Sequence, residues 1–171
     1  MPSIALDRIN AMTPEAFLAA LGGVFEHSPW IAERAFAARP FAGVAALHAA
    51  MVDVVQRASR AEQLALLRAH PELAGMEAQA GTMTADSTVE QGTAGLDALS
   101  RAEMQRIADL NRRYRDRFGF PFIIAVRRHT KASILGEFER RLGLDAETEL
   151  ANCLEQVFLI TRLRLDGIIP G

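Results

Sequence analysis

The sequence contains a single cysteine, Cys153, among 171 residues. One cysteine cannot form a disulfide within the chain, which fits a reducing compartment. The N-terminal stretch MPSIALDRINAM has charges inside its short apolar part, unlike a signal peptide, and the C-terminal GIIPG contains no recognisable sorting tripeptide. We therefore expect a cytoplasmic protein.

Long apolar runs, clustered metal ligands and phosphate-binding loops are also missing. The longest apolar run, FGFPFIIAV, is far shorter than the ~20 residues of a membrane span. The four histidines have no close ligand spacing and no CxxC pair accompanies them, so no metal site is predicted. No glycine-rich loop follows a predicted strand, so nothing supports a fold that binds a nucleotide cofactor.

Neither sign of charge is in excess. The 19 basic and 21 acidic residues leave a formal net charge of −2, so electrostatics give no reason to expect nucleic acid or a membrane surface as a partner. The densest basic run, NRRYRDRFG, is interrupted by Asp116 and has helical spacing. Such a run is typical of a solvated helix face.

Helix signals, by contrast, are dense. Half of the residues are hydrophobic, which is enough to bury a core. We predict an all-α fold: one domain over residues 1–171, built as a bundle of about seven to eight helices with one extended buried segment. Helix starts are predicted at Thr13-Pro14, Ser28-Pro29, Asp145 and the capping boxes Ser59–Glu62 and Ser100–Glu103, and helix ends at Gly119 and Gly143.

Two stretches depart from the helical pattern. PFIIAV, which begins at Pro121, is rich in branched and aromatic residues, but a strand needs a partner strand and none is predicted. We interpret it as the extended buried segment, lying between two helices. Residues 75–87 are only weakly helical and are predicted to form a long loop, a feature that is often functional.

His70 lies in LRAHPELAG, where a helical segment meets a proline. A residue before proline is disfavoured in the helical conformation, so the helix should end near Ala69, and Pro71-Glu72 suit the first turn of a short new helix. A histidine at such a junction has two interpretations. It either caps and packs, or it serves as a general acid or base near neutral pH.

The stretch STVEQ, residues 87–91, also has two interpretations. Ser87 and Glu90 match the capping-box pattern and would begin a helix. Gln91 adds a second polar side chain, and the N-terminus of a helix presents free N–H groups that can bind a carboxylate or carbonyl oxygen. The same residues therefore suit either a helix cap or a binding site.

Arg127 and Arg128 end the apolar PFIIAV segment. A guanidinium at the edge of an apolar pocket can bind a carboxylate through two parallel hydrogen bonds. An arginine pair on the surface, at the entry to the next helix, is the alternative. The residues alone do not separate the two.

LRAHPELAG, STVEQGTAGLDAL and NRRYRDRFGFPFIIAVR, in this order, resemble the 2-oxo-4-hydroxy-4-carboxy-5-ureidoimidazoline (OHCU) decarboxylase family of purine catabolism. GGVFEHSPWIAERA and ILGEFERRL extend the resemblance over most of the chain. It implies an all-helical, cofactor-free carboxy-lyase that converts OHCU, formed during urate degradation, to (S)-allantoin. Relatives are commonly dimers and are cytosolic in bacteria, so the resemblance implies a cytoplasmic homodimer.

By matching motif positions, the resemblance makes His70 the catalytic histidine. Loss of carbon dioxide leaves an electron pair that the neighbouring carbon–nitrogen unsaturation of the substrate can accept, so no cofactor is required. We expect His70 to donate the proton and Glu90 to assist it, because a nearby carboxylate favours imidazolium. The resemblance places these further residues in the substrate pocket: Pro71, Ser87, Gln91, Ile123, Ile124, Ala125 and Arg127.

We expect Gln91 and Ser87 to hold the ureido and ring carbonyl groups. Arg127, or backbone groups of residues 123–126, would hold the ring or its carboxylate. Two other functions stay open: a non-catalytic helical module that binds a ligand, and a cofactor-free hydrolase or racemase that uses His70 and Glu90 as an acid–base pair. The identity and optical rotation of the product would separate them.

Overall fold

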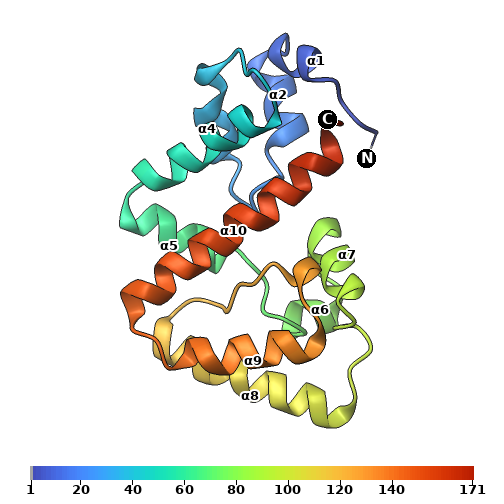
Figure 1. Cartoon of the computed structure of the whole chain (residues 1–171), viewed down its shortest axis with the longest axis vertical. Coiled ribbons are helices and arrows are strands. Elements are labelled where there is room, and N and C mark those ends of the chain that lie inside the picture. The colour runs from blue at the N-terminus through green and yellow to red at the C-terminus, as the bar shows by residue number, and fades with distance from the viewer. Residues whose placement is uncertain (1) are drawn as a thin grey trace. The chain divides into compact units, whose positions relative to one another are not determined.

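The computed structural model describes residues 2–171, and within them the chain forms ten α-helices and no strand (Figure 1). The all-α prediction is confirmed, but the predicted count of seven to eight helices was too low. Helices α1 and α6 have five residues each, too few to show the apolar periodicity by which helices are found in sequence. The α-helices are α1 (Leu6–Asn10), α2 (Pro14–Leu21), α3 (Trp30–Ala35), α4 (Val44–Arg57), α5 (Arg60–Arg68), α6 (Met76–Ala80), α7 (Ala85–Thr93), α8 (Arg101–Phe118), α9 (Lys131–Leu142) and α10 (Ala146–Ile168), and two 3₁₀ turns are η1 (Phe36–Ala38) and η2 (Val126–Arg128).

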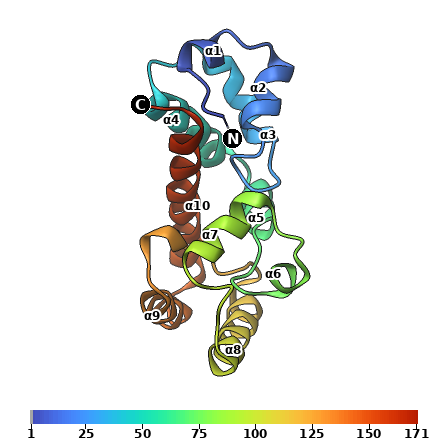
Figure 2. The ribbon, with the colours of Figure 1, turned by 90° about the vertical axis from the view of Figure 1, so that its right-hand side faces the viewer.

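The chain divides into two compact units. One consists of the chain up to Ala69 together with Phe158–Gly171, and the other of His70–Val157. Helix α10 contributes to both and is continuous, as Figure 2 shows. None of the helices among residues 2–171 has the length and hydrophobicity needed to cross a membrane. Every residue predicted for the site belongs to the second unit. The prediction of a single domain over residues 1–171 stays a prediction.

In the first unit, α3 packs against α2 and α4. Thr13 caps α2 as predicted, since its side chain accepts a hydrogen bond from Ala16 N. The predicted cap at Ser28 is wrong: α3 begins at Trp30 without a side-chain cap, and the Ser28 hydroxyl instead donates to the carbonyl of Glu26. The local carbonyl thus competes successfully for the hydroxyl.

In the second unit, α8 lies against α9 (Figure 1). Ser100 and Glu103 form the predicted capping box of α8, and Gly119 ends the helix with φ of 77°. Tyr114 is fully buried at the centre of this core, where its ring meets the rings of Phe118, Phe120, Phe122 and Phe138. The other helix boundaries confirm local predictions, because Ser59 and Glu62 cap α5, Asp145 binds Thr148 N at the start of α10, and Gly143 ends α9.

Candidate functional site

His70 begins the second unit, two residues after the end of α5. Ala69 is the C-cap of α5, as the proline after His70 predicts. The predicted short helix at Pro71-Glu72 is wrong: the chain turns here, and α6 begins only at Met76. His70 is 8 % exposed and Pro71 is buried.

The loop of residues 71–75 does not become helical because side chains from other elements bind its backbone. Gln91 Nε2 donates to the carbonyl of Glu72 at 3.3 Å, and Gln91 Oε1 accepts from Ala74 N at 2.9 Å. Asn111 Nδ2 donates to the carbonyl of Leu73 at 2.9 Å. Two side-chain amides therefore hold three successive residues directly after His70-Pro71.

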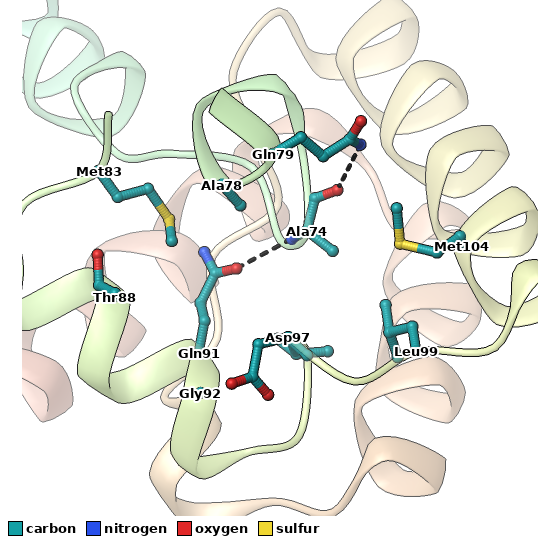
Figure 3. Close-up of a pocket in the computed structure, with 11 residues that line it drawn as sticks. Ala74, Ala78, Gln79, Met83, Thr88, Gln91, Gly92, Asp97, Leu99 and Met104 are labelled. Atoms are coloured by element: carbon teal, nitrogen blue, oxygen red, sulfur yellow. Dashed lines mark hydrogen bonds between the residues drawn. The ribbon is translucent and has the colours of Figure 1, made fainter. Parts of the chain in front are cut away.

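The tight turn of this loop depends on two small residues. Ala74 has φ of 47°, in the left-handed region that costs a residue with a Cβ roughly 1–2 kcal/mol. At Gly75, a Cβ would lie 2.8 Å from the Cβ of Glu72, so only glycine fits without a shift. Gln79 Nε2 donates to the carbonyl of Ala74 at 3.2 Å from the other side (Figure 3).

Helix α7 carries the STVEQ stretch, but it starts earlier than predicted. Its N-cap is Thr84, whose side chain accepts from Ser87 N, so the predicted capping box of Ser87 and Glu90 is wrong. Thr84 offers the same hydroxyl chemistry three residues upstream, and the predicted loop of residues 75–87 accordingly contains α6 and the start of α7. Ser87, Glu90 and Gln91 then share one helix face, with Ser87 and Gln91 buried and Glu90 half-buried.

The PFIIAV segment is extended and buried between α8 and α9, as predicted. Arg141 Nη1 donates to the carbonyl of Ile123 at 2.8 Å, and the amide of Ala125 donates to Gln156 Oε1 at 3.0 Å. The side chains of Ile123, Ile124 and Ala125 are at most 3 % exposed. The chain's own side chains thus hold the backbone of this segment, and the N–H of Ala125 is engaged by the protein.

Helix α7 lies beside η2, the turn that follows PFIIAV. This packing brings the helix with Ser87, Glu90 and Gln91 to the end of the extended segment that leads to Arg127. The side chains of Arg127 and Arg128 are exposed. Through the amide of Gln91 on one side and this packing on the other, α7 connects all three predicted motifs within the second unit.

A pocket of about 390 Å³ opens beside the loop of residues 71–75 (Figure 3). Its size suits a small molecule. Met83, Leu96, Leu99 and Met104 supply apolar walls, and Gln91 is the one predicted site residue among the described residues that line it. Gln91 therefore lines this pocket and also binds the loop directly after His70.

Comparison with known proteins decides the family. The sequence profile of OHCU decarboxylases matches residues 10–166, which is nearly the whole chain. The chain belongs to the OHCU decarboxylase family. The resemblance inferred from LRAHPELAG, STVEQ and PFIIAV is thereby confirmed. The expected extent of the resemblance over most of the chain is confirmed as well, since the matched residues lie in both units.

Individual similar proteins agree with this assignment. The 2-oxo-4-hydroxy-4-carboxy-5-ureidoimidazoline decarboxylase of Haloferax volcanii is 42 % identical over 165 residues, 96 % of either chain. The uric acid degradation bifunctional protein PucL of Bacillus subtilis is also 42 % identical, over 96 % of this chain and 32 % of that protein. A crystal structure of (S)-allantoin synthase superimposes with a TM-score of 0.76 at 31 % identity, over 97 % of this chain and 54 % of the crystallised one.

Two polar residues of this OHCU decarboxylase family member were missed by the sequence reasoning. Asn111 lies on the buried face of α8, four residues after Ile107 and three before Tyr114. Arg141 likewise follows the buried Phe138 of α9 by three residues. A polar residue at an apolar position of a helical stripe is the signal that would have found both.

Arg141 is the centre of a buried polar cluster with Glu149, Tyr114 and Cys153. Arg141 Nη2 donates to Cys153 Sγ at 3.2 Å, and the Tyr114 hydroxyl donates to Glu149 Oε1 at 2.6 Å. Burial raises the pKa of Cys153 and of Tyr114, so both stay protonated at neutral pH. Burial opposes the charge of Arg141, but its hydrogen bond to Glu149 and its electrostatic interactions with all three other residues of the cluster together outweigh this, and the pKa of Arg141 is raised. A protonated thiol is a poor nucleophile, so Cys153 is not a candidate for nucleophilic catalysis.

Proposed function

We propose that this protein catalyses the decarboxylation of OHCU to (S)-allantoin in urate degradation, without a cofactor. The sequence identity of 42 % to a decarboxylase over 96 % of both chains supports the substrate. The observation that carries the proposal is the amide of Gln91, which joins α7 to the loop directly after His70. The loop that follows the proposed proton donor is thus hydrogen-bonded to the helix that carries Ser87 and Glu90.

In the proposed reaction the bond between the carboxylate and the ring carbon breaks, and carbon dioxide leaves. The electron pair that remains moves into the adjacent carbon–nitrogen unsaturation of the substrate. His70, as imidazolium, then delivers one proton to one face of the neighbouring, ureido-bearing carbon, which sets the S configuration. The carbon that lost carbon dioxide becomes a carbonyl as its hydroxyl proton passes to the ring nitrogen that took up the electron pair. Glu90 stabilises the imidazolium before the transfer. Holding substrate and donor in this arrangement supplies several kcal/mol of the barrier reduction.

The remaining predicted residues are proposed to bind the substrate. Ser87 offers a hydroxyl on the buried face of α7. The side-chain nitrogen Nε2 of glutamine carries two hydrogens, so Gln91 keeps one donor for the substrate after binding the carbonyl of Glu72. Arg127 is proposed to bind the carboxylate, while the side chains of Pro71, Ile123, Ile124 and Ala125 exclude water from the ring.

The protein is further proposed to act in the cytoplasm as a homodimer, with OHCU as its substrate and neither nucleic acid nor a membrane as its partner. The formal net charge of −2 gives no electrostatic attraction for nucleic acid or for an anionic membrane surface, which supports this part of the proposal. Size-exclusion chromatography with light scattering tests the dimer. A monomer at micromolar concentration would contradict it.

The activity is tested by generating OHCU in situ from urate with the two preceding enzymes and following the optical rotation of allantoin. The expected result is faster loss of OHCU and accumulation of the S enantiomer when the protein is added. Spontaneous decay without the protein gives the control rate and a racemic product. Binding of allantoin with no effect on OHCU decay would instead support the non-catalytic module, and a product other than allantoin would support a hydrolase or racemase.

A further inference from the structure

We infer that Asn111 is a positioning residue for His70, acting through the loop of residues 71–75. Asn111 lies on α8 and is 5 % exposed. Its Nδ2 donates to the carbonyl of Leu73 at 2.9 Å, three residues after His70. The inference rests on the proposed role of His70 as proton donor and adds a residue to it that does not touch the substrate.

The packing of α8 does not explain an asparagine at this position. Ile107, Leu110 and Tyr114 form the buried face of the helix around it, where a leucine of similar volume would suit the apolar surroundings. The Oδ1 of Asn111 is buried and has no hydrogen-bond partner among the described residues. A buried acceptor without a partner destabilises a fold. The contribution of this side chain that offsets the cost is its hydrogen bond to the carbonyl of Leu73.

The loop that Asn111 binds has a conformation that it would not adopt by itself. Ala74 has φ of 47°, and such backbone geometry persists only where the surroundings enforce it. Gln91 binds Glu72 and Ala74 on either side of Leu73. Asn111 supplies the hydrogen-bond donor for the carbonyl of Leu73 between them. Without this bond the middle of the turn is held only by its ends.

A loosened turn displaces His70, because Pro71 transmits the direction of the loop through its fixed φ. Proton delivery depends on placement, and a shift of about 1 Å at a reacting group can cost on the order of 100-fold in rate. Of the proposed substrate-binding groups, Arg127 lies on η2 and makes no hydrogen bond to this loop, within residues 2–171, that would transmit the shift to it. The loss should therefore appear mainly in kcat, with a much smaller change in KM.

The test is Asn111→Leu, with Asn111→Ala as a second variant should the first not fold. We expect kcat for OHCU to fall by about 10- to 100-fold with KM within about 3-fold of wild type. Ile107→Val is the matched control, since it removes one methyl group from the same buried face without touching the loop. It should lower the unfolding midpoint and leave kcat unchanged.

A double-mutant cycle separates positioning of His70 from a general structural role. Adding Asn111→Leu to His70→Ala should cause no further loss of rate, because the group being positioned is absent. An equal loss in both backgrounds would overturn the inference, and so would an unchanged kcat in Asn111→Leu.

Amide hydrogen exchange of residues 72–75 tests the same inference without the reaction. Exchange in this loop should be faster in Asn111→Leu and unchanged in Ile107→Val. Exchange at the wild-type rate in Asn111→Leu would overturn the inference. Absence of decarboxylation by the wild-type protein would overturn the proposed function instead, and faster loop exchange would then still show the hydrogen bond holding the loop.

Discussion

Arg141 Nε donates to Glu149 Oε1 at 2.6 Å, and the two side chains are 2 % and 0 % exposed. The same guanidinium donates to the carbonyl of Ile123, so this ion pair joins α9, α10 and the extended segment. A buried ion pair gains little over apolar side chains that pack equally well, but removing one partner leaves an uncompensated charge. The pair therefore makes the placement of PFIIAV depend on both residues.

Replacing Arg141 should destabilise the protein strongly. Arg141→Met leaves Glu149 charged and buried, and we expect the free energy of unfolding to fall by about 3–5 kcal/mol. Arg140→Met is the matched control: its neighbouring ion pair with Glu137 is exposed, and such pairs contribute at most about 1 kcal/mol. Urea unfolding of both variants measures the difference, and equal midpoints would contradict the role of Arg141.

Removal of the imidazole of His70 should abolish most of the catalysis. His70→Ala is expected to lower kcat by about 10²–10⁴-fold, the usual contribution of a positioned general acid. The allantoin that still forms should be racemic, because no group delivers a proton to one face. His129→Ala changes a histidine outside the proposed site and should keep both rate and enantiomeric excess. Near wild-type rate and selectivity in His70→Ala would show that another group donates the proton.

The assistance of Glu90 can be tested by the pH dependence of the rate. Glu90→Gln keeps the size of the side chain but removes the negative charge that favours the imidazolium. We expect the basic limb of the pH–rate profile to move to lower pH, with kcat at neutral pH reduced by about 10-fold. Limbs that stay where they are in wild type would rule out the pairing of Glu90 with His70.

Arg127 and Arg128 form a natural pair of variants, since both are exposed and adjacent. If Arg127 binds the carboxylate of OHCU, Arg127→Ala should raise KM by about 10-fold or more, as expected for a hydrogen bond to a charged group. Arg128→Ala should leave KM unchanged. Equal effects of the two substitutions on KM would mean that neither guanidinium binds the carboxylate specifically and would favour backbone groups.

His48 should make the first unit sensitive to acid. Its ring nitrogen Nε2 lies 3.0 Å from Thr161 Oγ1, and burial, with a contribution from the charge of Arg162, lowers its pKa. The folded state therefore binds the proton less readily than the unfolded chain, whose histidine titrates near 6.5. Stability from this residue is present above that pH and is lost as the pH falls below it.

His48→Gln should flatten this acid-induced loss. The free energy of unfolding of the wild type is expected to decrease from pH 7.5 to pH 5.5 more steeply than that of the variant. Urea unfolding at a series of pH values measures both slopes. Parallel curves for the two proteins would show that His48 does not contribute to the loss.

Most of the helix boundaries predicted from the sequence alone are confirmed, because capping groups lie close together along the chain. Ser59 with Glu62 and Ser100 with Glu103 form the predicted capping boxes, and Gly119 ends α8 in the left-handed conformation. A cap involves groups three residues apart, so it can be recognised within a short stretch of sequence. Ser87 shows the limit of that reasoning, since Thr84 competes for the same role and takes it.

The motifs of the site were also readable in the sequence, because His70, STVEQ and PFIIAV occur in a specific combination. How these motifs are held depends on contacts between distant parts of the chain. Asn111 binds Leu73 across 38 residues, and Gln91 binds Ala74 across 17. No local pattern predicts such partners, since they meet only when packing brings distant helices together. The sequence thus specifies which groups are present and which helices carry them, and the packing of the core specifies which backbone atoms those groups bind.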